Sequence, residues 1–197
     1  MDKKLRIGVY GGTFDPIHRT HLAIARAALD HARLDRVLFV VSAAPPHKQA
    51  DVYAGPEDRF QMVQAALADE PRMEVSRLEL DRKGLSFTAD TLRELQAAHP
   101  GAELFLIVGY DALLDIPNWH HPREILSRAK LLAVPRPGAR LPVPRDLAGR
   151  YEMLPFAESE VSSTEIRARI AAGHDARDLL PPAVERLIRE KSLYHEV

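Results

Sequence analysis

The sequence has no cysteine, and its charges almost cancel. Without cysteine the chain cannot form disulfides, bind a metal through thiolates or use a cysteine nucleophile. Lysine and arginine total 27 and aspartate and glutamate total 28, which gives a formal net charge of -1. A surface that binds polyanions in general needs an excess of basic residues. We therefore expect no nucleic-acid partner, and we expect any phosphate contact to be local.

Long apolar runs are also missing. The longest, such as Val37–Val41 and Leu104–Val108, are far shorter than the roughly 20 residues that a membrane-spanning helix needs. The apolar run within Met1–Gly12 is interrupted by Gly8 and is too short for a signal peptide. We expect no membrane partner and a cytoplasmic location.

What the sequence does contain is an alternation of short apolar runs with amphipathic segments. The runs that predict strands are Arg6–Tyr10, Val37–Ser42, Met73–Leu80, Glu103–Val108 and Lys130–Val134. The segments that predict helices between them are His21–Ala32, Pro56–Ala68 and Thr88–Ala98. Nearly continuous apolar strands separated by helices indicate a parallel sheet covered on both faces. Because crossovers are right-handed, we predict an α/β fold with a doubly wound parallel sheet.

The domain organisation predicted from the sequence is simple. A length of 197 residues is between the usual sizes of one domain and two small ones, and no repeat or change of composition marks a boundary. We predict a single domain over residues 1–197, with residues 159–197 as its carboxyl-terminal helical part. Two helices are expected in that part, Thr164–Ala171, stopped by Gly173, and Ala183–Lys191.

In such a sheet, ligands bind at the carboxyl ends of the strands, near the point where the strand order reverses. After the first predicted strand, Gly11 and Gly12 allow a tight turn and a close approach of a ligand to the backbone. His18 and His21 are three residues apart at the start of the next helix, an arrangement that suits a phosphate. The alternative is that the glycines only turn the chain and the histidines are surface residues or a capping pair. The sequence lacks the spacings of a zinc site, a P-loop and the dinucleotide fingerprint.

A second polar helix start lies near the carboxyl end. Ser162 and Glu165 have the spacing of a capping box, which by itself explains both residues. The adjacent hydroxyls of Ser163 and Thr164, free helix N–H groups and Arg167 one turn later also form an anion site. Two anion sites in one small domain favour a polyphosphate ligand.

Taken together, these motifs resemble those of a known superfamily. Gly-Gly-Thr-Phe-Asp-Pro-Ile-His-x-x-His at residues 11–21 and Ser-Ser-Thr-x-Ile-Arg at residues 162–167 are similar to the signatures of nucleotidyltransferases that share their histidine motif with class I aminoacyl-tRNA synthetases. More narrowly, the chain resembles the bacterial nicotinate-nucleotide adenylyltransferases. Further matches, in chain order, are Pro45–Lys48, Arg59–Met62, Ser86–Leu92, Gly109, Asp111, Trp119, Arg136–Gly138, Leu193 and Tyr194. The resemblance spans essentially the whole chain.

This resemblance implies a Rossmann-like nucleotidyltransferase fold and a reaction in NAD biosynthesis. The reaction transfers AMP from ATP to nicotinate mononucleotide and yields deamido-NAD and pyrophosphate. The residues implied in catalysis are His18 and His21, which would stabilise charge at the α-phosphate, and Arg167, which would hold the leaving group. The residues implied in ATP binding are Gly11, Gly12, Thr13, Phe14, Gly109, Ser163 and Thr164. The implied cofactor is Mg²⁺, held by phosphate oxygens and water rather than by protein ligands.

The residues that the resemblance implies in acceptor binding are Lys48, Thr88, Asp111, Trp119 and Arg136. The nicotinate ring would lie against Trp119, its carboxylate would bind N–H groups near Thr88, and a ribose hydroxyl would bind Asp111. Lys48 would approach the phosphates, and Arg136 is either a phosphate contact or a charged turn residue. On the sequence alone, Trp119 is equally well explained as a partly buried packing residue.

Two positions depart from the family pattern. Thr20 stands where the signature has glycine, and Tyr110 stands between Gly109 and Asp111, where a small residue is usual. A β-branched side chain at position 20 would crowd the nucleotide, so we predict that Thr20→Gly lowers the KM for ATP.

Two other functions stay open at this point. One keeps the reaction but uses another acceptor, nicotinamide mononucleotide or phosphopantetheine. The other is a regulatory module that binds a nucleotide without catalysis. Both histidines and the whole of Ser162–Arg167 are retained, which favours an enzyme.

Overall fold

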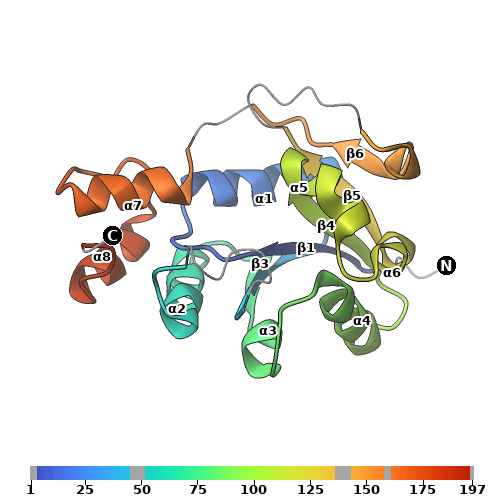
Figure 1. Ribbon diagram of the computed structural model, residues 1–197, viewed down its shortest axis with the longest axis horizontal. Coiled ribbons are helices and arrows are strands. Elements are labelled where there is room, and N and C mark those ends of the chain that lie inside the picture. Colours follow the sequence, from blue (N-terminus) through green and yellow to red (C-terminus); the bar gives the residue numbers. More distant parts are fainter. Residues whose placement is uncertain (1–3, 45–51, 136–142, 158–160, 196–197) are drawn as a thin grey trace.

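The computed structural model describes residues 4–44, 52–135, 143–157 and 161–195. At its centre is a sheet of six strands in the order β3-β2-β1-β4-β5-β6 (Figure 1), and every pair of neighbours is parallel. The strands are β1 (Arg6–Gly12), β2 (Arg36–Val41), β3 (Met73–Ser76), β4 (Glu103–Gly109), β5 (Ala129–Val134) and β6 (Tyr151–Met153). The strand order reverses at β1, which has β2 on one side and β4 on the other.

Helices cover both faces of this sheet, as a doubly wound fold requires. They are α1 (Arg19–His31), α2 (Pro56–Ala66), α3 (Leu78–Asp81), α4 (Thr88–Ala98), α5 (Tyr110–Asp115), α6 (Pro122–Arg128), α7 (Ser163–Ala171) and α8 (Pro182–Glu190), with the short 3₁₀ helices η2 (Ile116–Asn118) and η3 (Arg145–Leu147). In Figure 1, α1 lies on one side of the sheet and α3 and α4 lie on the other. Across the described ranges, no helix is long and apolar enough to cross a membrane.

Alternate residues of β1 pack on opposite faces of the sheet. Ile7 and Val9 belong to a buried cluster that contains residues of α4, α5 and α6. Tyr10 belongs to a second buried cluster, which contains residues of α1, α2, α7 and α8. Gly8 lies between Ile7 and Val9 in the sequence. A Cβ on Gly8 would lie 2.9 Å from Cγ2 of Val37, so a larger residue would push β1 away from β2. The core therefore has two layers, and β1 is central to both.

One predicted strand is partly wrong, and several short elements were not predicted. The structure confirms the other predicted strands and helices, with ends that shift by at most two residues. Within Met73–Leu80, however, β3 ends at Ser76 and the chain turns into α3. Ser76 Oγ accepts a hydrogen bond from the Leu78 N–H at 3.3 Å, a local side-chain bond that favours a turn over an extended strand. Strand β6 and helices α5 and α6 were missed because they are too short to show a clear periodicity.

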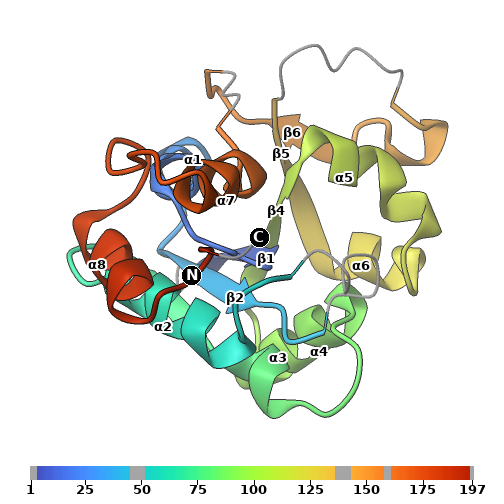
Figure 2. The same ribbon diagram turned by 60° about the vertical axis from the view of Figure 1, so that its left-hand side comes forward.

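The carboxyl-terminal helices lie against the carboxyl end of β1. In Figure 1, α7 lies next to the start of α1, and α8 contacts α2 (Figures 1 and 2). The first N–H of α1, from Arg19, donates to the Leu179 carbonyl at 2.9 Å. Ile166 of α7 and Val184 of α8 are buried in the same cluster as Tyr10. Segments from the two ends of the sequence therefore meet at the point where the strand order reverses.

Candidate functional site

The carboxyl ends of β1 and β4 lie side by side where the strand order reverses, which is the point at which doubly wound sheets form their ligand crevice. Tyr10 is paired in register with Ile107, so Gly12 and Gly109 lie at the same level of these neighbouring strands. A Cβ added to Gly11 or to Gly109 would have no atom within 4 Å. In doubly wound sheets, ligands bind at this switch point. The structure therefore leaves room for a ligand to approach the backbone at Gly11 and Gly109.

The loop between β1 and α1, residues 13–18, has a shape that aromatic packing maintains. Phe14 has a φ of +50°, which non-glycine residues rarely adopt. Its ring is buried and makes an edge contact with Tyr10 (centroids 5.6 Å apart) and a tilted contact with Phe39 (5.5 Å). A Cβ on Gly12 would lie 3.0 Å from this ring, so glycine is needed there for the packing. Phe14 therefore acts mainly as a packing residue of the loop, and its edge also meets the His21 ring at 5.2 Å.

His18 and His21 form a stacked pair at the start of α1. Their ring centroids are 3.8 Å apart with an interplanar angle of 29°. The His18 N–H donates to His21 Nδ1 at 3.2 Å, so part of the predicted capping role is realised. His18 is only 4% exposed. Burial lowers the pKa of His18 to about 4, and burial followed by repulsion from His18 lowers the pKa of His21 well below its usual value.

Both rings are therefore neutral at pH 7, and the hydrogen bond fixes the tautomer of one. Since His21 Nδ1 accepts a hydrogen bond from the His18 N–H, the hydrogen of the neutral His21 ring is carried by Nε2. A neutral imidazole N–H can donate to a phosphate oxygen without adding a charge to the resting site. The first-turn amides of α1 are partly occupied, because the His21 N–H bonds to the His18 carbonyl at 3.0 Å.

Helix α7 brings the second motif to the same loop. Ser163 Oγ donates to the Pro16 carbonyl at 2.9 Å, and Arg167 Nη1 donates to the Asp15 carbonyl at 2.8 Å. Arg167 Nη2 lies 3.4 Å from Thr164 Oγ1, to which it donates. At the start of the helix, Ser162 Oγ accepts from Glu165 N–H at 3.2 Å, as the capping-box spacing predicts. The structure thus brings Ser163, Thr164 and Arg167 together with the loop that precedes His18.

Unpartnered buried atoms gather around this loop. In the described part of the chain, five buried side-chain N or O atoms have no hydrogen-bond partner. Three of them, His18 Nδ1, Arg59 Nη2 and Arg167 Nε, belong to residues in or bonded to the loop. Because buried polar atoms are normally bonded, such a concentration marks a place built to receive polar ligand atoms or water.

Sequence reasoning assigned no role to three residues that hold the loop. Asp15 is buried and accepts hydrogen bonds from two backbone amides and from the Tyr194 hydroxyl. Arg59 is also buried and donates to the Thr13 carbonyl at 2.7 Å. All three stand within motifs that the resemblance matched. Each is a polar residue in a matched motif to which the resemblance assigned no ligand, and this was the signal that could have revealed a role in holding the loop.

The acceptor side of the crevice is more open. Thr88 begins α4, and the preceding Ser86 Oγ accepts from the Ala43 N–H at 3.1 Å, which places this segment next to the chain that follows β2. The Phe87 ring stacks on His120 with centroids 4.2 Å apart, so the neighbours of Thr88 and Trp119 touch. Thr88 and Trp119 are therefore near one another, as the resemblance implies.

The structure fits both interpretations of Trp119, as a stacking face for the nicotinate ring and as a packing residue. Its Nε1 donates to Asp115 Oδ2 at 3.2 Å, and its ring packs partly buried on the cluster under α5 and α6. Asp111 is exposed in the first turn of α5, two residues after Gly109. The remaining two acceptor predictions, Lys48 and Arg136, lie outside the described residues.

The donor set at the crevice does not suit a protein-bound metal ion. Within the described ranges, no three histidine, aspartate or glutamate side chains gather in a way that could hold a metal. The buried carboxylate nearest the histidines, Asp15, is already engaged by three donors. Neutral histidines and guanidinium groups are ligands for anions rather than for Mg²⁺.

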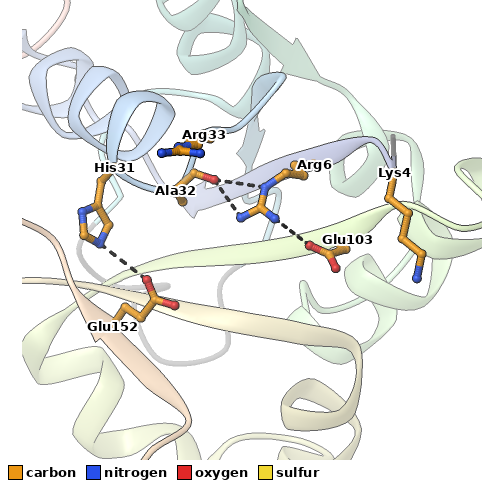
Figure 3. Close-up of a pocket in the computed structure, with 7 residues that line it drawn as sticks. All are labelled: Lys4, Arg6, His31, Ala32, Arg33, Glu103 and Glu152. Carbon is orange, nitrogen blue, oxygen red and sulfur yellow. Dashed lines mark hydrogen bonds and ion pairs between the residues drawn. The ribbon is translucent and has the colours of Figure 1, made fainter. Parts of the chain in front are cut away.

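A hollow of about 580 Å³ lies elsewhere, at the amino ends of β1 and β4 (Figure 3). Two of the basic side chains that line it, Arg6 and His31, already have partners. Arg6 donates through Nη1 to Glu103 Oε2 at 2.9 Å and through Nε and Nη2 to the Ala32 carbonyl at the end of α1, and His31 Nε2 lies 3.5 Å from Glu152 Oε2. This arrangement caps α1 and fixes it to the sheet, so we assign the hollow a structural role.

Known proteins match both the sequence and the fold. The cytidylyltransferase-like family model matches residues 9–169. A probable nicotinate-nucleotide adenylyltransferase of Shouchella clausii is 43% identical over 96% of this chain and 96% of its own length. One from Thermus thermophilus is 46% identical over 96% of this chain and 100% of its own length. The structure of a Plasmodium falciparum nicotinic acid mononucleotide adenylyltransferase complexed with NaAD has the same fold, with a TM-score of 0.79 at 17% identity over 97% of this chain and 98% of that one. The chain belongs to the nicotinate-nucleotide adenylyltransferase family of cytidylyltransferase-like proteins.

Proposed function

We propose that this protein transfers AMP from ATP to nicotinate mononucleotide, forming deamido-NAD and pyrophosphate. The observation that carries the proposal is that Ser163 and Arg167 bond to the loop that leads to the stacked His18–His21 pair, at the carboxyl end of β1. Relatives that are 43% and 46% identical over nearly their whole length are named for the same activity. We also propose that the chain forms one domain, since α7 and α8 share a buried cluster with the sheet.

The reaction needs no protein nucleophile. A phosphate oxygen of the acceptor attacks the α-phosphorus of ATP in line, and the bond from that phosphorus to the bridging oxygen of the leaving pyrophosphate breaks. The bonding electrons leave with the pyrophosphate. The protein contributes by positioning both substrates and by stabilising the charge that develops on the phosphate oxygens.

We assign the histidines to the α-phosphate. His21 presents Nε2–H as a donor, because its Nδ1 is occupied by the His18 N–H. The neighbouring His18 is buried and neutral, and its unpartnered Nδ1 leaves capacity for a further polar contact. Donors that are already dehydrated and fixed cost little reorganisation when charge develops.

We assign the start of α7 to the leaving pyrophosphate. Ser163 and Arg167 are held by main-chain oxygens of the loop, and Arg167 retains an unpartnered Nε–H. Gly11 and Gly109 leave the space in which the nucleotide would lie, and Gly12 accommodates the Phe14 ring beside it. Mg²⁺ is proposed to enter with ATP, held by phosphate oxygens and water. It would neutralise charge on the triphosphate when bound.

We assign the acceptor to the other wall of the crevice. Trp119 would carry the nicotinate ring, amides at the start of α4 near Thr88 would bind its carboxylate, and Asp111 would bind a ribose hydroxyl. The Phe87–His120 stack joins these two segments into one surface. The predicted roles of Lys48 and Arg136 and the cytoplasmic location stay predictions.

The test is pyrophosphate release from ATP and Mg²⁺ with each of three acceptors: nicotinate mononucleotide, nicotinamide mononucleotide and phosphopantetheine. We expect release with nicotinate mononucleotide and identification of deamido-NAD by mass spectrometry. A higher kcat/KM with nicotinamide mononucleotide or phosphopantetheine would show that the protein prefers that acceptor to nicotinate mononucleotide. Absence of release with all three, while ATP still binds, would favour the regulatory module.

A further inference from the structure

Asp15 is the point at which four separate segments of the chain meet. Its side chain is 1% exposed. Oδ2 accepts from the Tyr53 N–H at 2.7 Å, and Oδ1 accepts from the Ala54 N–H at 3.1 Å and from the Tyr194 hydroxyl at 2.7 Å. Its main-chain carbonyl accepts from Arg167 at 2.8 Å. One residue of the histidine loop therefore contacts the segment before α2, helix α7 and the segment after α8.

Buried Arg59 holds the segments around Asp15 together. Arg59 is fully buried and donates to the carbonyls of Thr13 (2.7 Å), Ser42 (2.8 Å) and Ala54 (3.1 Å). The charges of Arg59 and Asp15 also attract one another, and the Asp15 carboxylate accepts hydrogen bonds from three neutral donors. Hydrogen bonds to a buried carboxylate are among the stronger ones, and losing one leaves the carboxylate incompletely satisfied.

Tyr194 is placed for this contact at some cost to its backbone. It has a φ of +68°, and Ser192 before it has a φ of +50°. The ring is only 5% exposed although the residue follows the last helix. Burial and the neighbouring charge of Asp15 raise the pKa of the Tyr194 hydroxyl, which therefore stays protonated and can donate. Unfavourable backbone conformations persist where the surroundings demand them, and here the demand is a hydrogen bond to the histidine loop.

Arg167 connects the same point to the leaving-group side. Its guanidinium lies over the Tyr53 ring, with Cζ 4.5 Å from the ring centroid. The Tyr53 N–H is in turn fixed by Asp15. Movement of the Asp15 carboxylate would therefore disturb the main chain that precedes His18 and, through Tyr53, the cation of α7.

We propose that Tyr194 is a positioning residue for adenylyl transfer: by donating to Asp15 it fixes the 13–18 loop and Arg167 in the arrangement that receives the triphosphate. The inference rests on the proposed function, because it gives Tyr194 a role in that reaction. It concerns the ATP side alone. The acceptor wall, formed by α4 and the segment around Trp119, makes none of these contacts among the described residues.

The experiment compares Tyr194→Phe with Lys191→Gln. The first removes one oxygen and keeps the ring. The second loosens the same segment, since Lys191 Nζ donates to Asp58 Oδ1 and Gln61 Oε1 of α2, but it does not touch Asp15. We expect Tyr194→Phe to lower kcat about tenfold and to raise the KM for ATP, with an unchanged KM for nicotinate mononucleotide. Lys191→Gln should leave all three values as in the wild type.

Unchanged kinetics in folded Tyr194→Phe would overturn the proposal, as would an equal effect in both variants. If Tyr194→Phe does not fold, Asp15→Asn removes the charge while keeping the shape, and the same split between kcat and the two KM values is expected. Wild-type values in Asp15→Asn would also overturn the proposal.

A second measurement separates this proposal from the proposed function. Amide hydrogen exchange reports the Tyr53 and Ala54 N–H groups that bond to Asp15. We expect slow exchange in the wild type and in Lys191→Gln, and at least tenfold faster exchange in Tyr194→Phe. If the wild type releases no pyrophosphate, the proposed function fails, and exchange still decides whether Tyr194 holds the loop. Equal exchange in all three proteins would overturn that role.

Discussion

The two walls of the crevice are built in different ways. On the wall with His18 and His21, the loop is buried and bonded by residues from α2, α7 and the segment after α8. On the wall with Thr88 and Trp119, the side chains are partly exposed, and Phe87 stacks on His120. Fixed, dehydrated donors suit a constant chemistry at the triphosphate, whereas an open aromatic surface suits selection of an acceptor. Changes on the first wall should therefore lower kcat, and changes on the second should alter the KM of the acceptor.

The largest effect is expected from His21→Ala. The change removes the Nε2 donor assigned to the α-phosphate and the acceptor of the His18 N–H. We expect kcat to fall about 10²- to 10³-fold, with the KM for nicotinate mononucleotide little changed. Steady-state pyrophosphate release measures both. His174→Ala, at an exposed histidine after α7, is the matched control and should retain wild-type rates. A small change in kcat for His21→Ala would remove this residue from the chemistry.

The buried wall should also be the part most sensitive to acid. The pKa of His18 is about 4 in the folded protein and about 6.5 when unfolded, so the unfolded chain binds more protons between these values. Stability is therefore lost as the pH falls through 6.5 toward 4. From pH 7 to pH 5, the loss from His18 is about 2 kcal/mol. Urea unfolding at both values should show a larger decrease for the wild type than for His18→Gln, and equal decreases would contradict the assignment.

Trp119→Ala should affect the other wall. If the ring carries the acceptor base, the KM for nicotinate mononucleotide should rise about tenfold while the KM for ATP stays as it was. Trp119→Phe should recover much of the affinity, because it retains an aromatic face. If Trp119→Ala changes neither KM and only lowers the midpoint of unfolding, Trp119 is a packing residue of the cluster under α5 and α6.

The smallest effect is expected at Thr20, in the first turn of α1 between the two histidines. Thr20→Gly should lower the KM for ATP a few-fold, because it removes a branched side chain from the nucleotide's path. The same change should cost about 0.5–1 kcal/mol of stability, since glycine is unfavourable in a helix. An unchanged or higher KM would show that Thr20 does not crowd ATP.

The sheet could be predicted from sequence because its signal is local. Arg36–Val41 and Glu103–Gly109 are almost wholly buried, and such runs show as continuous apolar segments. The prediction was wrong at residues 77–80, because the Ser76 side chain bonds to the backbone there and the apolar pattern does not reveal that bond. Strand β6, with three residues, is too short for any pattern.

The site could be predicted only where a motif was contiguous. His18, His21 and the Ser162–Arg167 segment were found because each lies in a short run at a predicted helix start. The connection between them depends on Asp15, whose partners are 38 positions away at Tyr53 and 179 positions away at Tyr194. No periodicity or composition encodes which buried carboxylate meets which hydroxyl, so this part required the fold.

The separation of 179 positions between Asp15 and Tyr194 also bears on how the protein comes to be active. Contacts between residues far apart in the sequence form late in folding, because a long loop must be closed first. We therefore expect the histidine loop to take its final shape after the helices and the sheet have formed. During refolding, enzyme turnover should then be the last property to return.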